Sequence, residues 1–492
     1  MKSQRISITH SLCLVVVVAF LAGGIRSAAQ TKVEQIDRFM TLCHEYGQFN
    51  GSALVAENGT VIFKKGFGYA DMEWNIPNEP DTKFRLGSIT KQFTSMLIVQ
   101  LVEQGKLKLD RNISDYLPDY PKKNGERITI HDLLTHTSGI PNYTSFPQYF
   151  ASLSRNPMKP EDFIKVFADS ALDFEPGTRF SYSNSGYFVL GVIIEKITGK
   201  PYEQVLQENI LTPLGMKNTG YDHFGTVLAK RASGYQKNGL HYVNALYIDM
   251  ATPFSAGALY STVEDLYLWD QALYTDKLLT EKTKALLFKP YIPALGASYG
   301  YGWFVGNAPI GRSADSVMVI EHGGSINGFN TLISRIPADK DLIVLLNNTG
   351  GTRLGQMSRA IRGILYDKPY DMPKRSIADS VYAAIRQSGL DAGLGVYRDL
   401  KDHHSDTFEV LENEMNVYGY TLLQAGKLKE AIEVFKLNVE AFPKSSNVYD
   451  SLGEAYMDNG DKELAIANYK KSIELNPNNT NGIETLKKLQ AK

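Results

Sequence analysis

Apolar and polar residues alternate from residue 51 to residue 69, with Asn58-Gly59 in the middle of the run. A period of two is typical of half-buried strands, and Asn-Gly is a strong turn signal between paired strands. The segment therefore predicts a two-stranded hairpin. Residues 88–104 contain no Gly or Pro, are rich in apolar side chains and end at Gly105. They predict a buried helix.

Three further apolar runs, at residues 317–321, 331–336 and 342–347, are separated by turn residues that include Asp339-Lys340. They predict strands. Because strands occur at both ends of this region and helices between them, we expect an antiparallel sheet that joins sequence-distant strands and is covered by helices, an α/β (α+β) architecture.

A repeat of 34 residues marks the C-terminal part. Five positions of one window have counterparts of similar size in the next: Gly419, Gly426, Ala431, Phe435 and Pro443 match Gly453, Gly460, Ala465, Tyr469 and Pro477. The period and the residue sizes resemble the tetratricopeptide repeat, a helix–turn–helix unit. We expect two repeats over residues 409–492, with residues 480–492 as a closing helix. The repeats imply either a protein or peptide partner, or docking on the preceding domain.

The first 29 residues predict a signal peptide. Lys2 and Arg5 precede an apolar run of 11 residues, 11–21, and Ser27-Ala28-Ala29 supplies a cleavage site. An uncleaved anchor is the alternative, but a membrane span needs about 20 residues. The prediction is an exported protein, periplasmic or secreted, without a membrane span after cleavage. Between the signal peptide and the repeats, we expect a main domain over residues 30–368 and a partly helical linker over residues 369–408. Breaks in the helical structure are expected at 371–373 and 393–395.

Charge and cysteine content exclude several classes. Lys plus Arg total 52 and Asp plus Glu total 53 in 492 residues. The chain therefore lacks the excess of basic residues that is typical of nucleic-acid-binding proteins. Hydrophobic residues make up 43%, enough for real cores. After cleavage only Cys43 of the two cysteines remains, which rules out an intrachain disulfide framework.

Ser88 and Lys91 form the only S-x-x-K in the chain, directly after Gly87 at the start of the predicted buried helix. Residues three apart share a helix face, so Lys91 is expected beside Ser88. A buried lysine can be neutral and accept the serine proton. An ordinary capping serine with an exposed lysine is the alternative.

Two other segments could complete such a site. Tyr182 could move a proton and Asn184 could hold a substrate carbonyl, in a run that follows a Pro-Gly turn. At the end of the strand predicted at residues 317–321, Gly323 and Gly324 would allow close approach of the backbone to a ligand. Each segment taken alone is equally compatible with a loop or turn. The segment with the two glycines consists of His322, Gly323, Gly324 and Ser325.

In this order the three segments resemble the motifs of the serine β-lactamase-like hydrolases: class C β-lactamases, D,D-peptidases, D-aminopeptidases and related esterases. Flanking runs match as well, over roughly residues 35–365: FRLG at 84–87, HDLLTHTSGIP at 131–141, FEPG at 174–177, PLGM at 213–216 and YGYGW at 299–303. The resemblance implies a β-lactamase/transpeptidase-like domain, an antiparallel sheet flanked by helices with a helical subdomain. The all-α repeats follow it.

The resemblance also implies roles. Ser88 corresponds to the acylated nucleophile, Lys91 and Tyr182 to the shared base and acid, and Asn184 to a substrate contact. The N–H groups of Ser88 and Ser325 correspond to the oxyanion hole. His322 and Gly323 depart from the lysine and hydroxyl residue of typical β-lactamases. A mostly neutral histidine and a glycine make a weak carboxylate receptor, so a β-lactam substrate is in doubt and an ester or peptide-like amide is favoured. No cofactor is expected.

Three competing interpretations remain. Residues 296–300 match G-x-S-x-G around Ser298, but an α/β-hydrolase elbow requires a following helix. His131 and His136 are five apart, which does not suit a metal site on a helix, so no metal is expected. A non-catalytic binding or sensor protein, acting through its repeats, is the third.

Overall fold

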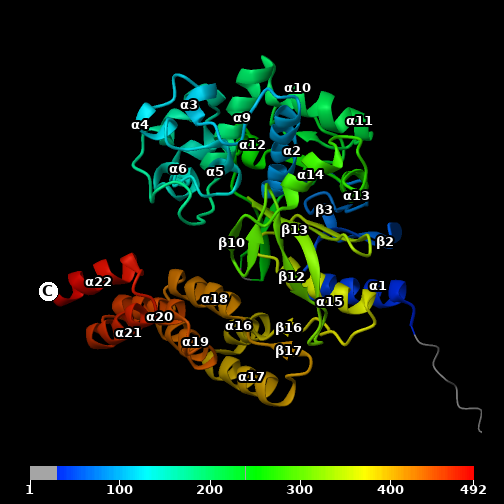
Figure 1. Cartoon of the computed structure of the whole chain (residues 1–492). Helices are drawn as coiled ribbons and strands as arrows, with labels where there is room; N and C mark the ends of the chain where they lie inside the picture. The colour runs from blue at the N-terminus through cyan, green and yellow to red at the C-terminus, as the bar shows by residue number, and fades with distance from the viewer. Residues whose placement is uncertain (1–29, 239, 492) are drawn as a thin grey trace, which may run out of the picture.

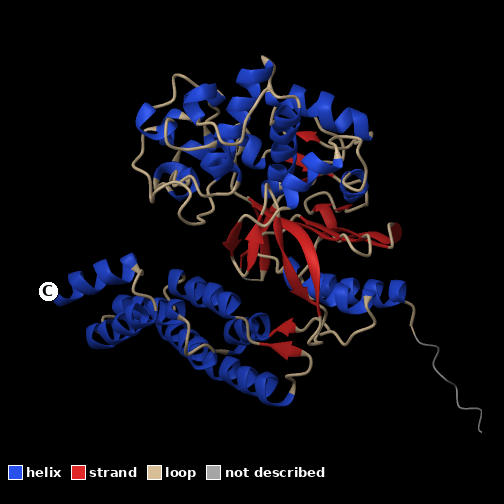
Figure 2. Ribbon diagram, viewed as in Figure 1, coloured by secondary structure: helices blue, strands red, loops and turns tan. Residues whose placement is uncertain are grey.

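The computed structural model describes residues 30–238 and 240–491 (Figures 1 and 2). The predicted signal peptide lies outside these residues. An eight-stranded antiparallel sheet forms the centre of the main domain, in the order β10-β11-β12-β13-β14-β15-β1-β2. Its strands are β1 (Gly51–Glu57), β2 (Thr60–Phe67), β10 (Ile292–Ala294), β11 (Ala297–Tyr299), β12 (Phe304–Pro309), β13 (Ser316–Ile326), β14 (Phe329–Ile336) and β15 (Asp341–Asn347).

The sheet joins the two ends of the domain, as the sequence predicts. Strand β1 pairs with β15, and Leu54 lies opposite Val344. Both strands are almost wholly buried because helices cover both faces of the sheet. Leu54 belongs to the core under the large helical layer, whereas Val55 packs with α1 (Lys32–Glu45) and α15 (Leu354–Leu365) on the other face. Figure 1 shows these helical layers on opposite sides of the sheet.

The helical subdomain is the large layer at the top of Figures 1 and 2. Its longest helices are α2 (Thr90–Glu103) and α9 (Asn184–Thr198). The other helices are α3 (Ile113–Tyr116), α4 (Lys122–Gly125), α5 (Ile130–Leu134), α6 (Gln148–Ala151), α7 (Pro160–Phe163), α8 (Lys165–Ala168), α10 (Tyr202–Leu206), α11 (Thr212–Leu214), α12 (Phe254–Gly257), α13 (Val263–Ala272) and α14 (Glu281–Phe288). Helix α2 is buried on nearly every side, as its dense apolar pattern predicts.

Short elements complete the main domain. The 3₁₀ turns are η1 (Gly87–Ile89), η2 (Tyr143–Ser145) and η3 (Leu153–Arg155), and the π-helical turn is η4 (Gln207–Leu211). The small sheets consist of β3 (Tyr69–Asp71) with β4 (Ile76–Pro77), of β5 (Phe84–Arg85), β9 (Leu259–Ser261) and β6 (Gly220–Tyr221), and of β7 (Tyr235–Asn238) with β8 (His241–Asn244).

The C-terminal region is helical and has its own core. Both predicted repeats are helix pairs in which a glycine faces an aromatic ring. Gly419 lies against Phe435 and Gly453 against Tyr469, so a side chain at either glycine would meet the ring. The helices are α16 (Ile377–Ser388), α17 (Leu390–His403), α18 (Glu412–Gln424), α19 (Leu428–Ala441), α20 (Ser446–Asn459), α21 (Lys462–Leu475) and α22 (Thr480–Ala491), and β16 (Arg375–Ser376) pairs with β17 (Phe408–Glu409).

Two local expectations differ from the structure. Residues 393–395 do not break the chain, because they lie inside α17, and Gly393 lets that helix pack closely on Ile385 of α16. The segment expected as a linker is therefore a helical hairpin that shares the core of the repeats. The segment from His322 to Ser325 does not end a strand, because β13 continues through it to Ile326.

Candidate active site

Ser88 lies in η1, where the chain turns from β5 into α2. Gly87 has a positive φ of 54°, and a Cβ there would lie 3.0 Å from the backbone nitrogen of Ser325. Strand β14 fixes this turn, because the Thr331 hydroxyl donates a hydrogen bond of 2.7 Å to the carbonyl of Leu86. The backbone of β13 thus passes directly beside the serine turn, and only a residue without a Cβ fits between them.

Lys91 extends from the first turn of α2 toward Ser88. Its Nζ is 3.2 Å from Ser88 Oγ and 2.8 Å from both Asn184 Oδ1 and the carbonyl oxygen of Ala256. The side chain is fully buried. Among the described residues no carboxylate pairs with it, and burial holds the pKa of Lys91 well below its usual value of 10.5.

Tyr182 packs against the same amine. Its ring centroid is 4.9 Å from Lys91 Nζ. The Tyr182 hydroxyl is buried and has no hydrogen-bond partner among the described residues. Burial raises the pKa of Tyr182 above its usual value of 10, so the phenol keeps its proton at neutral pH.

Asn184 is the first residue of α9, and a second amide orients it. The backbone N–H and the Nδ2 of Asn184 both donate to Oδ1 of Asn142, at 3.2 and 3.3 Å. This leaves Oδ1 of Asn184 directed at Lys91. Asn142 was not among the predicted site residues. Its place directly after the HDLLTHTSGIP run at residues 131–141 was the only signal for it.

His322 lies beneath the site in a chain of buried hydrogen bonds. Its Nδ1 is 2.6 Å from the carbonyl oxygen of Gly323, which makes Nδ1 the donor. Its Nε2 therefore accepts from the Tyr299 hydroxyl at 3.0 Å. His136 completes the chain, since its Nδ1 accepts from the Ser183 N–H and its Nε2 donates to Tyr299 at 3.2 Å. Burial lowers the pKa of His322 to about 3, so its imidazole is neutral.

The two glycines after His322 differ in their surroundings. A Cβ on Gly324 would lie 1.9 Å from the carbonyl oxygen of Leu86. A Cβ on Gly323 would lie 3.4 Å from that of Thr331, an ordinary contact. The second glycine is therefore required for the approach of β13 to the serine turn, and the first is not.

A pocket of about 420 Å³ opens in front of Ser88. Among the described residues, none that lines this pocket has a charged side chain. Lys91 and His322 lie behind the lining rather than in it. The side chains of the wall are aromatic, aliphatic, amide or hydroxyl groups: Ser88, Tyr143, Thr144, Tyr149, Phe150, Asn184, Gln236, Leu246, Ile248, Pro253, Ala256, Ser325, Ile326 and Asn327, with glycines 87, 257, 328, 350 and 351.

The structure thus brings Ser88, Lys91, Tyr182 and Asn184 together and places the backbone of Ser325 directly beside η1. His322, Gly323 and Gly324 support this arrangement from the strand. Ser298 of the G-x-S-x-G match is on β11, which leads into another strand and not into a helix, so the α/β-hydrolase alternative is wrong. His131 bonds Tyr301 at 2.7 Å, and no group of three metal-ligating side chains occurs in the described ranges.

Comparison with known proteins places this site in a family. The family model described as Beta-lactamase matches residues 32–365, more than half of the chain, and a tetratricopeptide-repeat model matches residues 451–479. The chain therefore belongs to the beta-lactamase family, and it is a β-lactamase-related serine hydrolase followed by helical repeats.

Similar proteins carry several names. The chain is 33% identical to a putative penicillin-binding protein, PbpX, of Bacillus subtilis, over 68% of this chain and 81% of the relative. It is 29% identical to a teichoic acid D-alanine hydrolase of Staphylococcus aureus, over 69% and 80%. The solved penicillin-binding protein of Bacillus halodurans is 30% identical with a TM-score of 0.59, covering 66% of this chain and 99% of that one.

Proposed function

We propose that the protein hydrolyses an uncharged ester or amide group through an acyl intermediate on Ser88. Neutral Lys91 accepts the Ser88 proton while Ser88 Oγ attacks the carbonyl carbon, and the N–H groups of Ser88 and Ser325 stabilise the oxyanion. Tyr182 donates its proton to the leaving alcohol or amine and recovers one from Lys91. Water then attacks the acyl carbonyl, which releases the acid and returns the proton to Ser88.

The environment of Lys91 supports its role as the base. A neutral amine has two N–H donors and one lone pair. Asn184 Oδ1 and the Ala256 carbonyl oxygen, both at 2.8 Å, are acceptors for the two donors. The lone pair is then left for the proton of Ser88, the third polar neighbour at 3.2 Å. Burial without a counter-charge favours this neutral form.

The uncharged pocket is the observation that carries the substrate class. A carboxylate placed there would lose its hydration and find no cationic side chain in the described lining. Both ring nitrogens of His322 are already engaged, with Tyr299 and with the carbonyl of Gly323. An ester or amide without an adjacent carboxylate therefore fits better than a penicillin or a cephalosporin, which both carry one.

A penicillin-binding D,D-peptidase or class C-like β-lactamase is the second candidate. It is favoured by the names of similar proteins, among them Penicillin-binding protein 4* of Bacillus subtilis, 31% identical over 75% of this chain. Its substrates would bring a carboxylate close to the reacting carbonyl. The two candidates therefore differ in the charge beside the scissile bond.

One parallel assay separates them. We would follow hydrolysis of p-nitrophenyl butyrate and of a chromogenic cephalosporin by the wild type and by Ser88→Ala. The proposal predicts ester hydrolysis that requires Ser88 and little or no cephalosporin turnover. Cephalosporin hydrolysis at a comparable kcat/KM would support the second candidate. Ester hydrolysis that persists in Ser88→Ala would contradict both.

Location and partners complete the proposal. The predicted signal peptide supports export to the periplasm or the medium, and no helix in the described ranges is long and apolar enough to cross a membrane. The repeats support a protein or peptide partner. Secretion of a tagged full-length chain, with loss of residues 1–29 found by N-terminal sequencing, tests the first point.

A further inference from the structure

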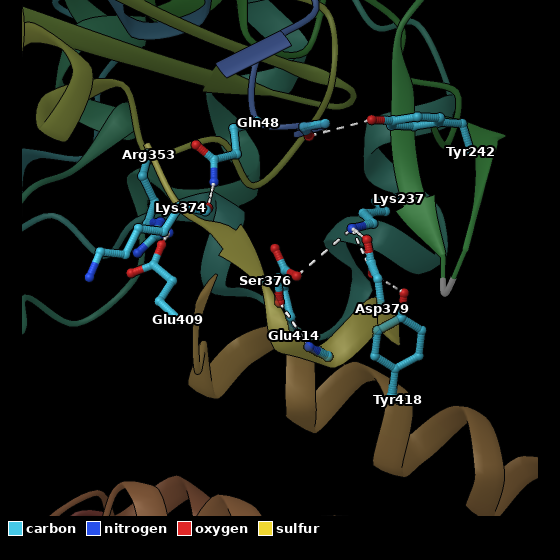
Figure 3. Close-up of polar contacts among 12 residues, drawn as sticks. Gln48, Lys237, Tyr242, Arg353, Lys374, Ser376, Asp379, Glu409, Glu414 and Tyr418 are labelled. Carbon is cyan, nitrogen blue, oxygen red and sulfur yellow. Dashed lines mark hydrogen bonds and ion pairs between the residues drawn. The ribbon is translucent and has the colours of Figure 1, made fainter. Parts of the chain in front are cut away.

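A groove of about 570 Å³ separates the catalytic domain from the C-terminal helices. One wall comes from α1, α15 and the loop at residues 349–353. The other comes from the segment at 371–374 and from the first half of α18, including Val417. Figure 3 shows polar contacts between these walls.

This groove adjoins the active-site pocket. Gln236, Gly350 and Gly351 line both hollows. Gln236 belongs to β7, and the two glycines belong to the loop after β15, so the two hollows meet at one rim. A chain bound at Ser88 can therefore continue over this rim toward α18.

Ion pairs and hydrogen bonds fix the walls of the groove. Nζ of Lys237, which follows Gln236 on β7, is 3.0 Å from both carboxylate oxygens of Asp379 on α16 (Figure 3). Arg353 pairs with Glu409 at 2.8 Å. The side chain of Gln48 donates to the carbonyl oxygen of Lys374 at 2.5 Å. These links join the two sides of the groove at separate points, so contacts within the chain itself fix its shape.

The lining suits a peptide. Its four basic side chains (Lys237, Arg353, Arg359, Lys374) are nearly balanced by three acidic ones (Asp371, Glu409, Glu414). A nucleic acid needs a clear basic excess, and a lipid chain needs a mainly apolar wall. Side-chain amides and the glycine backbone at 350–351 offer both donors and acceptors to peptide groups. Exposed apolar surface at Val417, 43% exposed, offers a contact for a side chain.

We propose that this groove binds a peptide segment of the substrate, several residues away from the carbonyl that Ser88 attacks. The inference rests on the proposed function. It makes the C-terminal region part of the substrate-binding surface: the pocket at Ser88 accepts the uncharged reacting group, and the groove binds the peptide attached to it.

The test uses fluorophosphonates, which label an activated serine, with no arm or with a peptide arm of two, four or six Ala, Gln and Ser residues. Six residues reach about 20 Å when extended. In the wild type, the six-residue arm should accelerate labelling of Ser88 about ten-fold over the armless probe, equivalent to about 1.4 kcal/mol. Val417→Trp, which fills the groove, should remove this acceleration and leave armless labelling unchanged. Gln424→Trp, exposed on the same helix outside the groove, is the matched control.

Each outcome decides one point. Equal rates for armed and armless probes in the wild type would overturn the groove assignment, as would an arm effect that survives in both Val417→Trp and Asn413→Trp. Photocrosslinking from a diazirine at the arm's end should map to residues 409–418 or 371–374; crosslinks only at residues 144–150 would also overturn it. Failure of the armless probe to label Ser88 would instead refute the proposed function.

Discussion

Lys91 Nζ lies 3.2 Å from Ser88 Oγ, and its other two polar neighbours, Asn184 Oδ1 and the Ala256 carbonyl oxygen, are both acceptors. In the part of the chain that the structure describes, no carboxylate pairs with the buried amine. Lysine and serine side chains three residues apart on a helix usually face solvent. Here the helix is enclosed by the sheet and by α9, and this burial is the basis on which we propose Lys91 as the base and Ser88 as the nucleophile.

The pH dependence of activity tests the state of this lysine. Burial lowers the pKa of Lys91, so the neutral, competent form predominates above that lowered pKa and is lost as pH falls through it. We expect kcat/KM for p-nitrophenyl butyrate to be substantial at pH 7 and to decrease toward acid. A profile that rises only near pH 10.5, the usual lysine value, would show that the amine is charged at neutrality.

Replacement of Lys91 by Met removes the amine at nearly constant length. We expect kcat/KM to fall by about 10²–10⁴-fold, the usual contribution of general acid–base catalysis. Lys196→Met, at an exposed position of α9, should retain wild-type activity. Thermal unfolding of both variants would show whether a loss of activity reflects chemistry or loss of the fold.

Tyr182→Phe removes only the hydroxyl that we assign to proton transfer. That hydroxyl makes no hydrogen bond among the described residues, so stability should change little while kcat falls about 10²-fold or more. Tyr149→Phe is the control, since Tyr149 also lines the pocket. An activity loss of the same size in both variants would argue against a specific role for Tyr182.

The two glycines after His322 give a sharp structural prediction. Gly324→Ala would place a methyl group 1.9 Å from the Leu86 carbonyl oxygen, and should both abolish labelling of Ser88 and lower the melting temperature. Gly323→Ala meets only an ordinary contact at 3.4 Å and should keep the fold and most activity. Equal activity of Gly324→Ala and Gly323→Ala would show that the close approach of β13 to the Leu86 carbonyl does not require a glycine at position 324.

The buried histidines predict sensitivity to acid. The folded-state pKa of His322, about 3, lies below its usual value of 6.5, and burial lowers the pKa of His136 as well. The unfolded chain therefore binds more protons below pH 6.5, and stability present above that pH is lost as pH falls toward 3. His322 contributes a slope of about 1.4 kcal/mol per pH unit in this window, and the lowered pKa of His136 acts in the same direction.

Urea unfolding between pH 7.5 and 4 measures this slope in the wild type and in His322→Gln. The variant lacks one of the two titrations, so its free energy of unfolding should decrease less steeply with acid. Identical slopes would mean that His322 takes up its proton over the same pH range in the folded protein as in the unfolded chain.

The sequence predicted the hairpin of β1 and β2, the buried helix α2 and the repeat helices because each has a local signal: a period of two, an uninterrupted apolar run or a 34-residue period. It predicted helical pieces in the segment 369–408 but wrongly placed a break at 393–395. Glycines such as Gly393 break isolated helices yet also permit close packing, and only the contact with Ile385 distinguishes the two.

Within the site, the motifs predicted the residues that meet but not those that orient them. Asn142 and Tyr299 act through tertiary contacts with Asn184 and His322, and no spacing in the chain reveals such contacts. The same limit applies to the pocket, whose uncharged wall combines side chains from widely separated segments.

The proposed mechanism depends on acylation of Ser88 during hydrolysis. The most direct measurement is mass spectrometry of the protein quenched in acid during turnover of p-nitrophenyl butyrate, followed by peptide mapping. We expect one butyryl group on Ser88 in the wild type and no adduct in Ser88→Ala. Ester hydrolysis with no acyl group on Ser88, or with the adduct on another residue, would contradict it.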